Sequence, residues 1–452
     1  MVVYSIAVIA EPDRVPTKRL AEVLAGIDPQ RHRRFVHRRA ELGWCEFATT
    51  AYIREHLQRI SVDRLVWGPD VLASVSRLGI PSAEVTDRAR ERAIAWGVPS
   101  GDVDAMIGSG TGVVAELRAE RPGPTIAVRV DMDALPIAES EDGAHAPRAL
   151  DFASAAPGVM HACGHDGHVA IGLGVAEALA AIRPQLAGTI RLLFQPAEEG
   201  TRGGVAFVDA GWLDDVDHFL SFHLSGLSGL HTGAFSPGVM ELLSTIKLDV
   251  RLHGRAAHFA SAPEEGRSAL GAGSAIALLA QGLPRRPGTR SLINVGRLDA
   301  GTGRNIVPEH GLLQMEVRAE TDELADELYR RVERLVSGVA SGLEVDSEVT
   351  VVGRAPAADS DDELAEHAAA AGRAMGLTRI DGLTMEASDD ASAMMRRVQE
   401  RGGDAVYAKV GTDLADGNHT PTFDLDEAAL PIGVELLVRS VLDVLGRPGS
   451  ER

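Results

Sequence analysis

Four short runs of continuously apolar, β-branched residues constrain the fold of this chain more than any other feature. They are TIAVRV (125–130), TIRLLF (189–194), HFLSFH (218–223) and AVYAKV (405–410). Ala- and Leu-rich segments with helical spacing lie between or after them, at 166–182, 202–211 and 424–445. Alternating strands and helices predict an α/β fold. Strands that are apolar at successive positions predict a mainly parallel central sheet covered on both faces.

The segment from about 240 to 354 has a different order of elements. It reads as strand STIKLDVRLHG, helix GRSALGAGSAIALLAQGL, strands RSLINVGRLDA and GLLQMEVRAE, helix ELADELYRRVERLVSGVA and strand DSEVTVVGR. This β-α-β-β-α-β order is typical of a ferredoxin-like α+β unit that folds on its own. Pro and Gly occur at both of its ends, near Pro237–Gly238 and Arg354–Pro356. We therefore predict one domain built from residues 1–238 and 355–452, with a second domain, 239–354, inserted into it.

Charge and cysteine content exclude several classes of protein. The formal net charge of -20 argues against nucleic acid or an anionic membrane as the main partner, because both require basic surfaces. Only two cysteines occur in 452 residues, which excludes a disulfide framework and indicates a reducing, cytoplasmic compartment. The first residues, MVVYSIAVIAEPDR, have no basic residue before their apolar run, so we expect no signal peptide. No window is long and apolar enough to span a bilayer.

The stretch HACGHDGH (161–168) concentrates side chains that bind metals at the start of a predicted helix. Cys163 and His165 are two residues apart, and on a helix they would point to different faces, so they reach one metal only from a turn. Gly164 permits such a turn. Asp166 lies where a helix cap or first-turn carboxylate belongs. The alternative is a capped helix with incidental histidines, and for His161 or His168 alone we favour a hydrogen-bonded role over ligation.

A second group of polar residues follows the predicted strands. Adjacent carboxylates such as Glu198 and Glu199 are usually solvated surface charges, but in open α/β sheets the active site lies beyond the carboxyl ends of the strands. Candidate ligands occupy that position after several strands: Asp131, Asp133, Glu198, Glu199, His223 and His419. Because Cys163 and His165 open a helix beside them, the sequence predicts that these residues meet at one end of the sheet.

The chemistry of this group follows from its residue types. Imidazoles, carboxylates and one thiolate suit one or two divalent ions, Mn²⁺ or Zn²⁺. Such ions activate water and polarise a carbonyl group. Another carboxylate, not bound to metal, must move the proton of the water to the leaving group. Two adjacent glutamates can divide these tasks, with one binding metal and one acting as base.

These motifs together resemble the M20 family of metallopeptidases and amidohydrolases. They occur in the family's order over roughly residues 30–445: VRVDMDALPI, HACGHDGH, FQPAEEG, FHL, GRAAHFA, GTGRNIVPE and NHTPTFD. The pattern is similar to the subfamily of hippurate hydrolase and auxin-conjugate amidohydrolases. Within it, GTGRNIVP, DDASAMMRRVQERGG and GNHTPTFDLDE most resemble the enzymes that act on p-aminobenzoyl-glutamate. The resemblance implies hydrolysis of the amide bond in an N-acyl or N-aroyl amino acid, with p-aminobenzoyl-glutamate as the leading candidate.

The resemblance also implies roles for individual residues. The implied metal ligands are Cys163, His165, Glu199, His223 and His419. Glu198 is the implied general base, and Asp133 the aspartate that orients a metal-binding histidine. In the inserted domain, His258 is expected to polarise the scissile carbonyl, often across a dimer. Asn305 and Arg318 are expected to hold the substrate, and Arg318 or Arg304 to meet its free carboxylate.

Two departures and two alternatives remain open. The chain reads AAHFA around His258 where related sequences mostly read GGHA. In two-metal peptidases of the wider family, a histidine stands at Asp131 and a bridging aspartate at Cys163, so a second ion is less certain here. A dipeptidase or aminopeptidase of the same fold is one alternative, and a non-catalytic partner subunit is another. We expect a homodimer formed through the inserted domain, or a heteromer with a related subunit.

Overall fold

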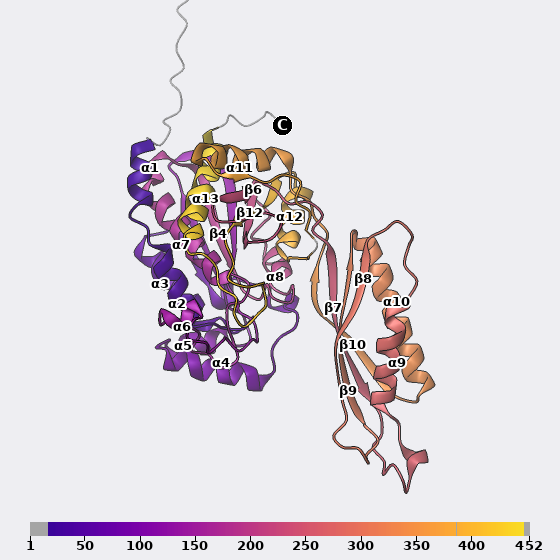
Figure 1. The fold of residues 1–452 in the computed structure, drawn as a ribbon. Helices are drawn as coiled ribbons and strands as arrows, with labels where there is room; N and C mark the ends of the chain where they lie inside the picture. Colours follow the sequence, from indigo (N-terminus) through magenta and orange to yellow (C-terminus); the bar gives the residue numbers. More distant parts are fainter. Residues whose placement is uncertain (1–16, 386, 447–452) are drawn as a thin grey trace, which may run out of the picture.

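A computed structural model describes residues 17–385 and 387–446. The chain forms two units and passes between them twice (Figure 1). The larger unit contains an eight-stranded sheet and the smaller one a four-stranded sheet. Each sheet has its own hydrophobic core. The predicted α/β class, with a mainly parallel central sheet and an appended α+β unit, is confirmed. The N-terminal stretch, for which the sequence predicts no signal peptide, lies outside the described residues.

The larger sheet has the strand order β1-β2-β4-β3-β5-β12-β6-β11. Its strands are β1 (Arg64–Trp67), β2 (Val113–Arg118), β3 (Arg121–Asp131), β4 (Ala187–Gln195), β5 (His218–Ser225), β6 (Ala234–Ser236), β11 (Thr378–Arg379) and β12 (Asp404–Gly411). The central strands β4, β3, β5 and β12 are parallel, and they contain the four apolar runs. Their carboxyl ends therefore lie at one edge, where the predicted ligands follow.

Helices cover both faces of this sheet, which explains why its strands are apolar at successive positions. One face packs against α1 (Thr17–Leu24), α2 (Pro29–Arg38), α3 (Phe47–Arg59), α7 (His165–Ala181), α11 (Asp362–Met375) and α13 (Ala429–Gly446). The other packs against α8 (Gly204–Asp209) and α12 (Ala391–Glu400). In β3, Val128 faces the first layer and Ala127 the second. The short helices α4 (Ala83–Ala95), α5 (Ser100–Met106) and α6 (Ala146–Ala149) lie at the rim.

The smaller unit has the predicted β-α-β-β-α-β order. Its elements are β7 (Ser244–His253), α9 (Ala269–Gln281), β8 (Ser291–Ala300), β9 (His310–Ala319), α10 (Asp322–Gly342) and β10 (Asp346–Ala355). The sheet order β10-β7-β9-β8 is antiparallel throughout. Both helices cover one face, and the other face is turned toward the larger unit (Figure 1). β7 starts beside the larger unit, so the loop 254–268 lies at the remote end.

Two predicted helices differ from those observed. The helix predicted at 424–445 begins at Ala429, because Asp424 and Glu427 instead form ion pairs with Arg33 of α2. The helix predicted at 202–211 spans only Gly204–Asp209, because Asp390 accepts hydrogen bonds from the N–H groups of Gly203 and Gly204 and fixes its start. Within the described ranges no helix meets the length and hydropathy of a membrane span.

Candidate metal centre and active site

The first pair of predicted ligands stands on either side of a tight turn, with Cys163 before it and His165 as the first residue of α7. Gly164 has φ 93° and is the N-cap of α7. This left-handed conformation is unfavourable for residues with a Cβ, which explains the glycine. The turn allows Cys163 before the cap and His165 after it to approach a common point, so their ligand atoms lie within 4.8 Å of those of His223.

All five predicted ligands meet at the carboxyl edge of the large sheet. Three overlapping trios have ligand atoms within 4.8 Å of one another: Cys163–His165–His223, Cys163–Glu199–His419 and His165–Glu198–Glu199. The Sγ atom of Cys163 lies 3.5 Å from Nε2 of His223. The Nε2 atom of His419 lies 3.6 Å from Oε1 of Glu199. The first trio shares only Cys163 with the second, so the arrangement suits two neighbouring ions as well as one.

Unpaired buried atoms indicate that this cluster fits a cation. The Nε2 atom of His165 and Oε1 of Glu199 are buried without a hydrogen-bond partner among the described residues. The Nδ1–H of His165 donates to the backbone oxygen of Asp133 at 2.9 Å. The ring proton is therefore on Nδ1, and the lone pair of Nε2 is available to bind a cation. Buried polar atoms without partners are costly. A divalent ion would satisfy both, and imidazole, thiolate and carboxylate are suitable donors.

Asp133 fixes the positions of both glutamates. Its carboxylate accepts hydrogen bonds from the backbone N–H groups of Glu198, at 2.9 Å, and Glu199, at 3.0 Å. The sequence predicts that Asp133 orients a metal-binding histidine. In the structure its backbone oxygen holds Nδ1 of His165, and its Oδ1 atom is 3.5 Å from the same nitrogen. Asp133 therefore connects the histidine to the glutamate pair.

The two glutamates lie in a crowded acidic environment. Burial, together with repulsion from Asp389 and Glu199, raises the pKa of Glu198 well above its ordinary value. Burial also raises the pKa of Glu199 to about 7. The Oε2 atom of Glu198 lies 3.8 Å from Nε2 of His165, at the border of the ligand cluster. Glu198 is thus placed to exchange a proton beside a bound cation.

The other two histidines of the HACGHDGH motif lie beside the predicted ligands, and His168 forms a further trio within 4.8 Å with Asp131 and His165. The Nδ1 atom of His168 lies 2.5 Å from Oδ1 of Asp131, and its Nε2 atom accepts the N–H of Leu224 at 2.9 Å. Both ring nitrogens are engaged, so His168 links α7 to β5. Burial lowers the pKa of His161 to about 4, which keeps that ring neutral.

Sequence reasoning missed several buried charges beneath the cluster. Arg129 is fully buried and donates to Asp131 at 2.7 Å, to Gln195 at 2.8 Å and to Asp390 at 3.1 Å. Lys409 stands opposite His223 in the pairing of β12 with β5. The sequence feature that could have revealed them is a charged residue within an otherwise apolar strand, which is Arg129 in TIAVRV and Lys409 in AVYAKV.

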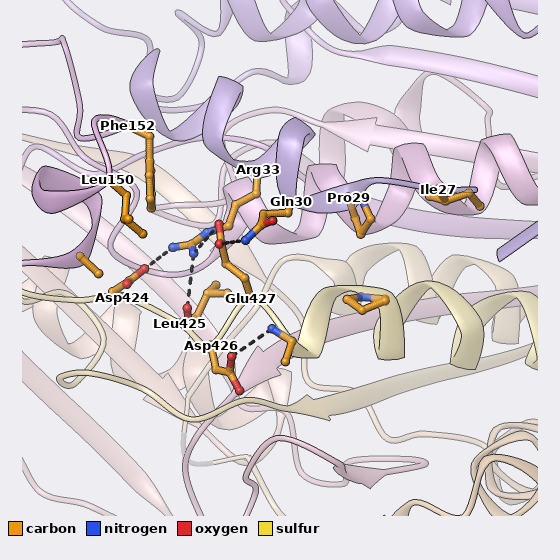
Figure 2. Close-up of a pocket in the computed structure, with 13 residues that line it drawn as sticks. Ile27, Pro29, Gln30, Arg33, Leu150, Phe152, Asp424, Leu425, Asp426 and Glu427 are labelled. Carbon is orange, nitrogen blue, oxygen red and sulfur yellow. Dashed lines mark hydrogen bonds and ion pairs between the residues drawn. The ribbon is translucent and has the colours of Figure 1, made fainter. Parts of the chain in front are cut away.

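Arg33 joins the ligand-bearing helix to the loop that follows His419. Its guanidinium donates to Asp166 at 3.0 Å, to Asp424, and to the backbone oxygen of Leu425 at 3.3 Å. Figure 2 shows Arg33 reaching Asp424, Leu425 and Glu427 beside a cavity of about 520 Å³. His37 completes this network at 2.8 Å from Asp166, and nothing in the pattern of α2 indicated it.

The predicted substrate residues of the smaller unit do not gather at the metal centre of their own chain. His258 is exposed in the remote loop, where its Nδ1 atom accepts N–H groups from Ala260, at 3.2 Å, and Ser261, at 3.3 Å. Arg304 and Asn305 are also exposed, just before β9 starts, and Ile306 pairs with His258. Arg318 lies toward the other end of β9, where it binds Glu316 at 2.9 Å and 3.1 Å.

One further cation faces the centre from the smaller unit. Lys247 lies in β7, near the junction with the larger unit, and its Nζ atom is 3.8 Å from Glu316. Lys247 lines a cavity together with Gly200 and Arg202, which follow Glu199 in the chain. Its positive charge acts to lower the pKa of both Glu199 and His419. In the sequence Lys247 is an ordinary polar position of an alternating strand, so no local signal marked it.

Comparison with known proteins identifies relatives over most of the chain. Residues 127–443 match the profile of peptidase family M20/M25/M40. Indole-3-acetyl-aspartic acid hydrolase of Enterobacter agglomerans is 42% identical over 417 residues, which cover 91% of this chain and 94% of that protein. One of the subunits of p-aminobenzoyl-glutamate hydrolase from Escherichia coli (strain K12) is 40% identical over 416 residues, with the same coverage of 91% and 94%.

A solved structure extends the similarity to the fold. The crystal structure of an aminobenzoyl-glutamate utilization protein from Klebsiella pneumoniae superposes with a TM-score of 0.77 and is 36% identical. The match covers 94% of this chain and 97% of the other. Both units are therefore included in the similarity.

Proposed function

The chain belongs to peptidase family M20/M25/M40 and is a hydrolase that acts on the amide bond of N-acyl amino acids, and we propose that its substrate is p-aminobenzoyl-glutamate. The observation that carries the proposal is the arrangement at the carboxyl edge of the sheet. Five ligand side chains converge there, and the carboxylate of Glu198 lies beside them. Metal-dependent amide hydrolysis needs both parts.

We propose that Cys163, His165, Glu199, His223 and His419 hold one or two divalent ions. When bound, such an ion lowers the pKa of a coordinated water and polarises the amide carbonyl. The single thiolate favours Zn²⁺, while imidazole and carboxylate groups also suit Mn²⁺. The unpaired atoms of His165 and Glu199 support this assignment.

Glu198 is the proposed proton carrier. Its carboxylate takes a proton from the attacking water and delivers it to the amine nitrogen as the C–N bond breaks. Burial and the neighbouring carboxylates raise the pKa of Glu198 above its ordinary value, which favours a group that holds the proton between the two steps. Asp133 keeps the backbone of the glutamate pair in place during both transfers.

The two curated relatives act, by their names, on amides of acidic amino acids that carry an aromatic acyl group. For this chain we propose the same class of substrate, with two carboxylates that need cationic partners. Arg304 is exposed, and no described residue forms an ion pair with its guanidinium. Arg318 is already paired with Glu316. We therefore favour Arg304, with Asn305 beside it, over Arg318 as the carboxylate-binding residue.

The alternatives differ in what they require of the site. A non-catalytic partner would not need a buried carboxylate beside five clustered candidate ligands, and the arrangement of Glu198 and those side chains therefore supports catalysis. A dipeptidase or aminopeptidase of the same fold would bind a free amino group instead of an aromatic acyl group. Beside the ligand cluster, Asp131 is paired with Arg129, and Asp133 accepts the backbone N–H groups of Glu198 and Glu199, so neither carboxylate is free to bind such an amine.

A substrate and metal screen tests the proposed function. Purified protein, freed of metal and reloaded separately with Mn²⁺, Zn²⁺ or Co²⁺, should hydrolyse p-aminobenzoyl-glutamate faster than hippurate or dipeptides. The paired measurement is metal content on the same samples. Preference for dipeptides would favour a peptidase. Full metal loading without turnover of any substrate would favour a non-catalytic partner.

We propose that residues 239–354 form a lid and dimerisation domain. β8 is an edge strand of the small sheet and exposes unpaired backbone groups. Large apolar side chains are exposed on it and on the adjoining α9: Leu270, Leu278, Leu279 and Leu292. Edge-to-edge pairing with a second copy, or with a related subunit, would cover both features. It would also allow His258 to serve the metal centre of the neighbouring chain.

Complementation between two inactive variants tests this arrangement. His258→Ala and Glu198→Gln chains should each be nearly inactive alone. Unfolded together and refolded, they should recover about a quarter of parental activity, because half of randomly paired symmetric dimers are mixed and each has one intact site. Mixed dimers without recovered activity would mean that His258 acts within its own chain or not at all.

A further inference from the structure

A second cluster of metal-binding side chains lies outside the catalytic centre, between three helices of the larger unit. It consists of His32 on α2, His56 on α3 and Glu177 on α7, whose ligand atoms lie within 4.8 Å of one another. These helices cover the same face of the sheet (Figure 1). Glu177 follows His165 by twelve residues on α7, so the cluster is about 18 Å along the helix from the catalytic ligands. None of its members takes part in the proposed reaction.

The geometry points to a divalent metal site held by His32, His56 and Glu177, and we propose that this site binds Zn²⁺ or a similar transition-metal ion. The Nε2 atom of His32 lies 3.3 Å from Oε1 of Glu177. The Nε2 atom of His56 lies 2.6 Å from the same oxygen. Ligands at about 2.0–2.2 Å from a tetrahedral ion are about 3.3–3.6 Å apart. The first distance fits this spacing, and the contact between His56 and Glu177 would have to lengthen on binding.

One of the two imidazoles is not satisfied by the carboxylate, whereas both ring nitrogens of His32 have partners in Tyr52 and Glu177. The Nε2 atom of His56 is buried and makes no hydrogen bond among the described residues, despite its short separation from Glu177. It therefore approaches the oxygen without the alignment of a hydrogen bond. A cation between the two atoms would convert this contact into two coordinate bonds.

Neighbouring side chains hold the ring of His32 in an orientation suitable for binding a metal. The Nδ1 atom of His32 is 2.7 Å from the hydroxyl of Tyr52, which orients the ring and directs Nε2 toward Glu177. Tyr52 and His56 are four residues apart on α3 and share one face of that helix.

The ligand atoms favour a class of ion, and the partial exposure of the side chains makes the site accessible from solvent. Two imidazoles and one carboxylate favour Zn²⁺, Co²⁺, Ni²⁺ or Cu²⁺ over Mg²⁺ and Ca²⁺, which prefer oxygen ligands. The side chains of His32, His56 and Glu177 are 7%, 14% and 23% exposed, so water can reach the cluster and complete the coordination.

The position of the site suggests a stabilising role. A bound ion would fasten α2 and α3 to α7 near the C-terminal end of α7. At the other end, Arg33 and His37 of α2 already bind Asp166 in its first turn. Binding to the folded chain alone stabilises it by linkage, so the melting temperature should rise with free zinc concentration.

Zinc content and thermal stability of the full chain test the site. At saturating Zn²⁺ the His56→Gln variant should hold about one ion fewer per chain than the parent and lose part of the zinc-dependent rise in Tm. The matched control is Glu55→Gln, which removes an exposed carboxylate one residue away that pairs with Arg59. It should keep the parental zinc content. Hydrolysis by His56→Gln, with the catalytic centre loaded, should be unchanged at moderate temperature.

Crystallography of the parent chain decides the matter if His56→Gln does not fold. Anomalous diffraction at the zinc edge should give a peak between the ring nitrogens of His32 and His56 and the carboxylate of Glu177. The proposal is overturned if that peak is absent, or if folded His56→Gln and Glu177→Gln both bind as much zinc as the parent. Loss of amidase activity in a separate assay would concern only the catalytic centre.

Discussion

Replacing Glu198 with glutamine should lower kcat by on the order of a hundredfold or more while leaving bound metal unchanged. Glutamine keeps the size of the side chain and removes its ability to accept the proton of the attacking water. The backbone N–H of residue 198 would still donate to Asp133, so the loop should keep its position. The measurement is steady-state hydrolysis of p-aminobenzoyl-glutamate, together with metal content by atomic emission.

The neighbouring glutamate supplies a matched control for this prediction. Glu199→Gln differs from Glu198→Gln by one position, yet it should lose metal as well as activity, because the Oε1 atom of Glu199 is an unpaired atom within the ligand cluster. If Glu198→Gln loses the metal and Glu199→Gln keeps it, the two roles have been exchanged. Substantial activity of Glu198→Gln would remove its role as general base.

Replacing His165 with alanine should remove metal and activity together, with a loss in kcat/KM on the order of a thousandfold. His165 belongs to three groups of side chains that could hold a metal, with Cys163 and His223, with Glu198 and Glu199, and with Asp131 and His168. Its Nε2 atom has no hydrogen-bond partner among the described residues. The substitution therefore removes a ligand atom that several of these groups share. Metal titration and hydrolysis assays on the same preparation measure both effects.

His231→Ala is a suitable control for the His165 variant, because His231 is exposed on a loop and belongs to none of the ligand trios. It should keep parental metal content and rate. A circular dichroism spectrum equal to that of the parent would show that His165→Ala is folded. Equal metal content in folded His165→Ala and parent would contradict the ligand assignment.

The parallel strands could be predicted from the sequence because their patterns are local. Each of the four apolar runs lies within an observed strand of the central parallel set, since residues buried on both faces leave a continuous hydrophobic signature. The small unit was predicted from its β-α-β-β-α-β order of strand and helix patterns, with Pro and Gly at both ends. Helix ends were less predictable. The start of α13 depends on ion pairs with Arg33, about 390 residues earlier in the chain.

The meeting of the ligands also followed from the sequence, given a parallel sheet. Side chains placed just after parallel strands must share one edge, so Glu198, Glu199 and His223 could be grouped before the structure was known. The orientation of each ligand could not. That Asp133 binds two backbone N–H groups, or that both nitrogens of His168 are engaged, depends on distances between segments far apart in the chain.

The sequence by itself determined the α/β class, the inserted β-α-β-β-α-β unit and the residue types gathered at the strand ends, because backbone propensity and strand direction are encoded locally. Only the tertiary structure decided which buried charges support the site, as with Arg129, and which residues of the small unit lie remote from the metal centre of their own chain. It also brought His32, His56 and Glu177 together from three helices. Such contacts arise from packing, in which the cost of burying a polar atom is met by a partner whose position no local pattern specifies.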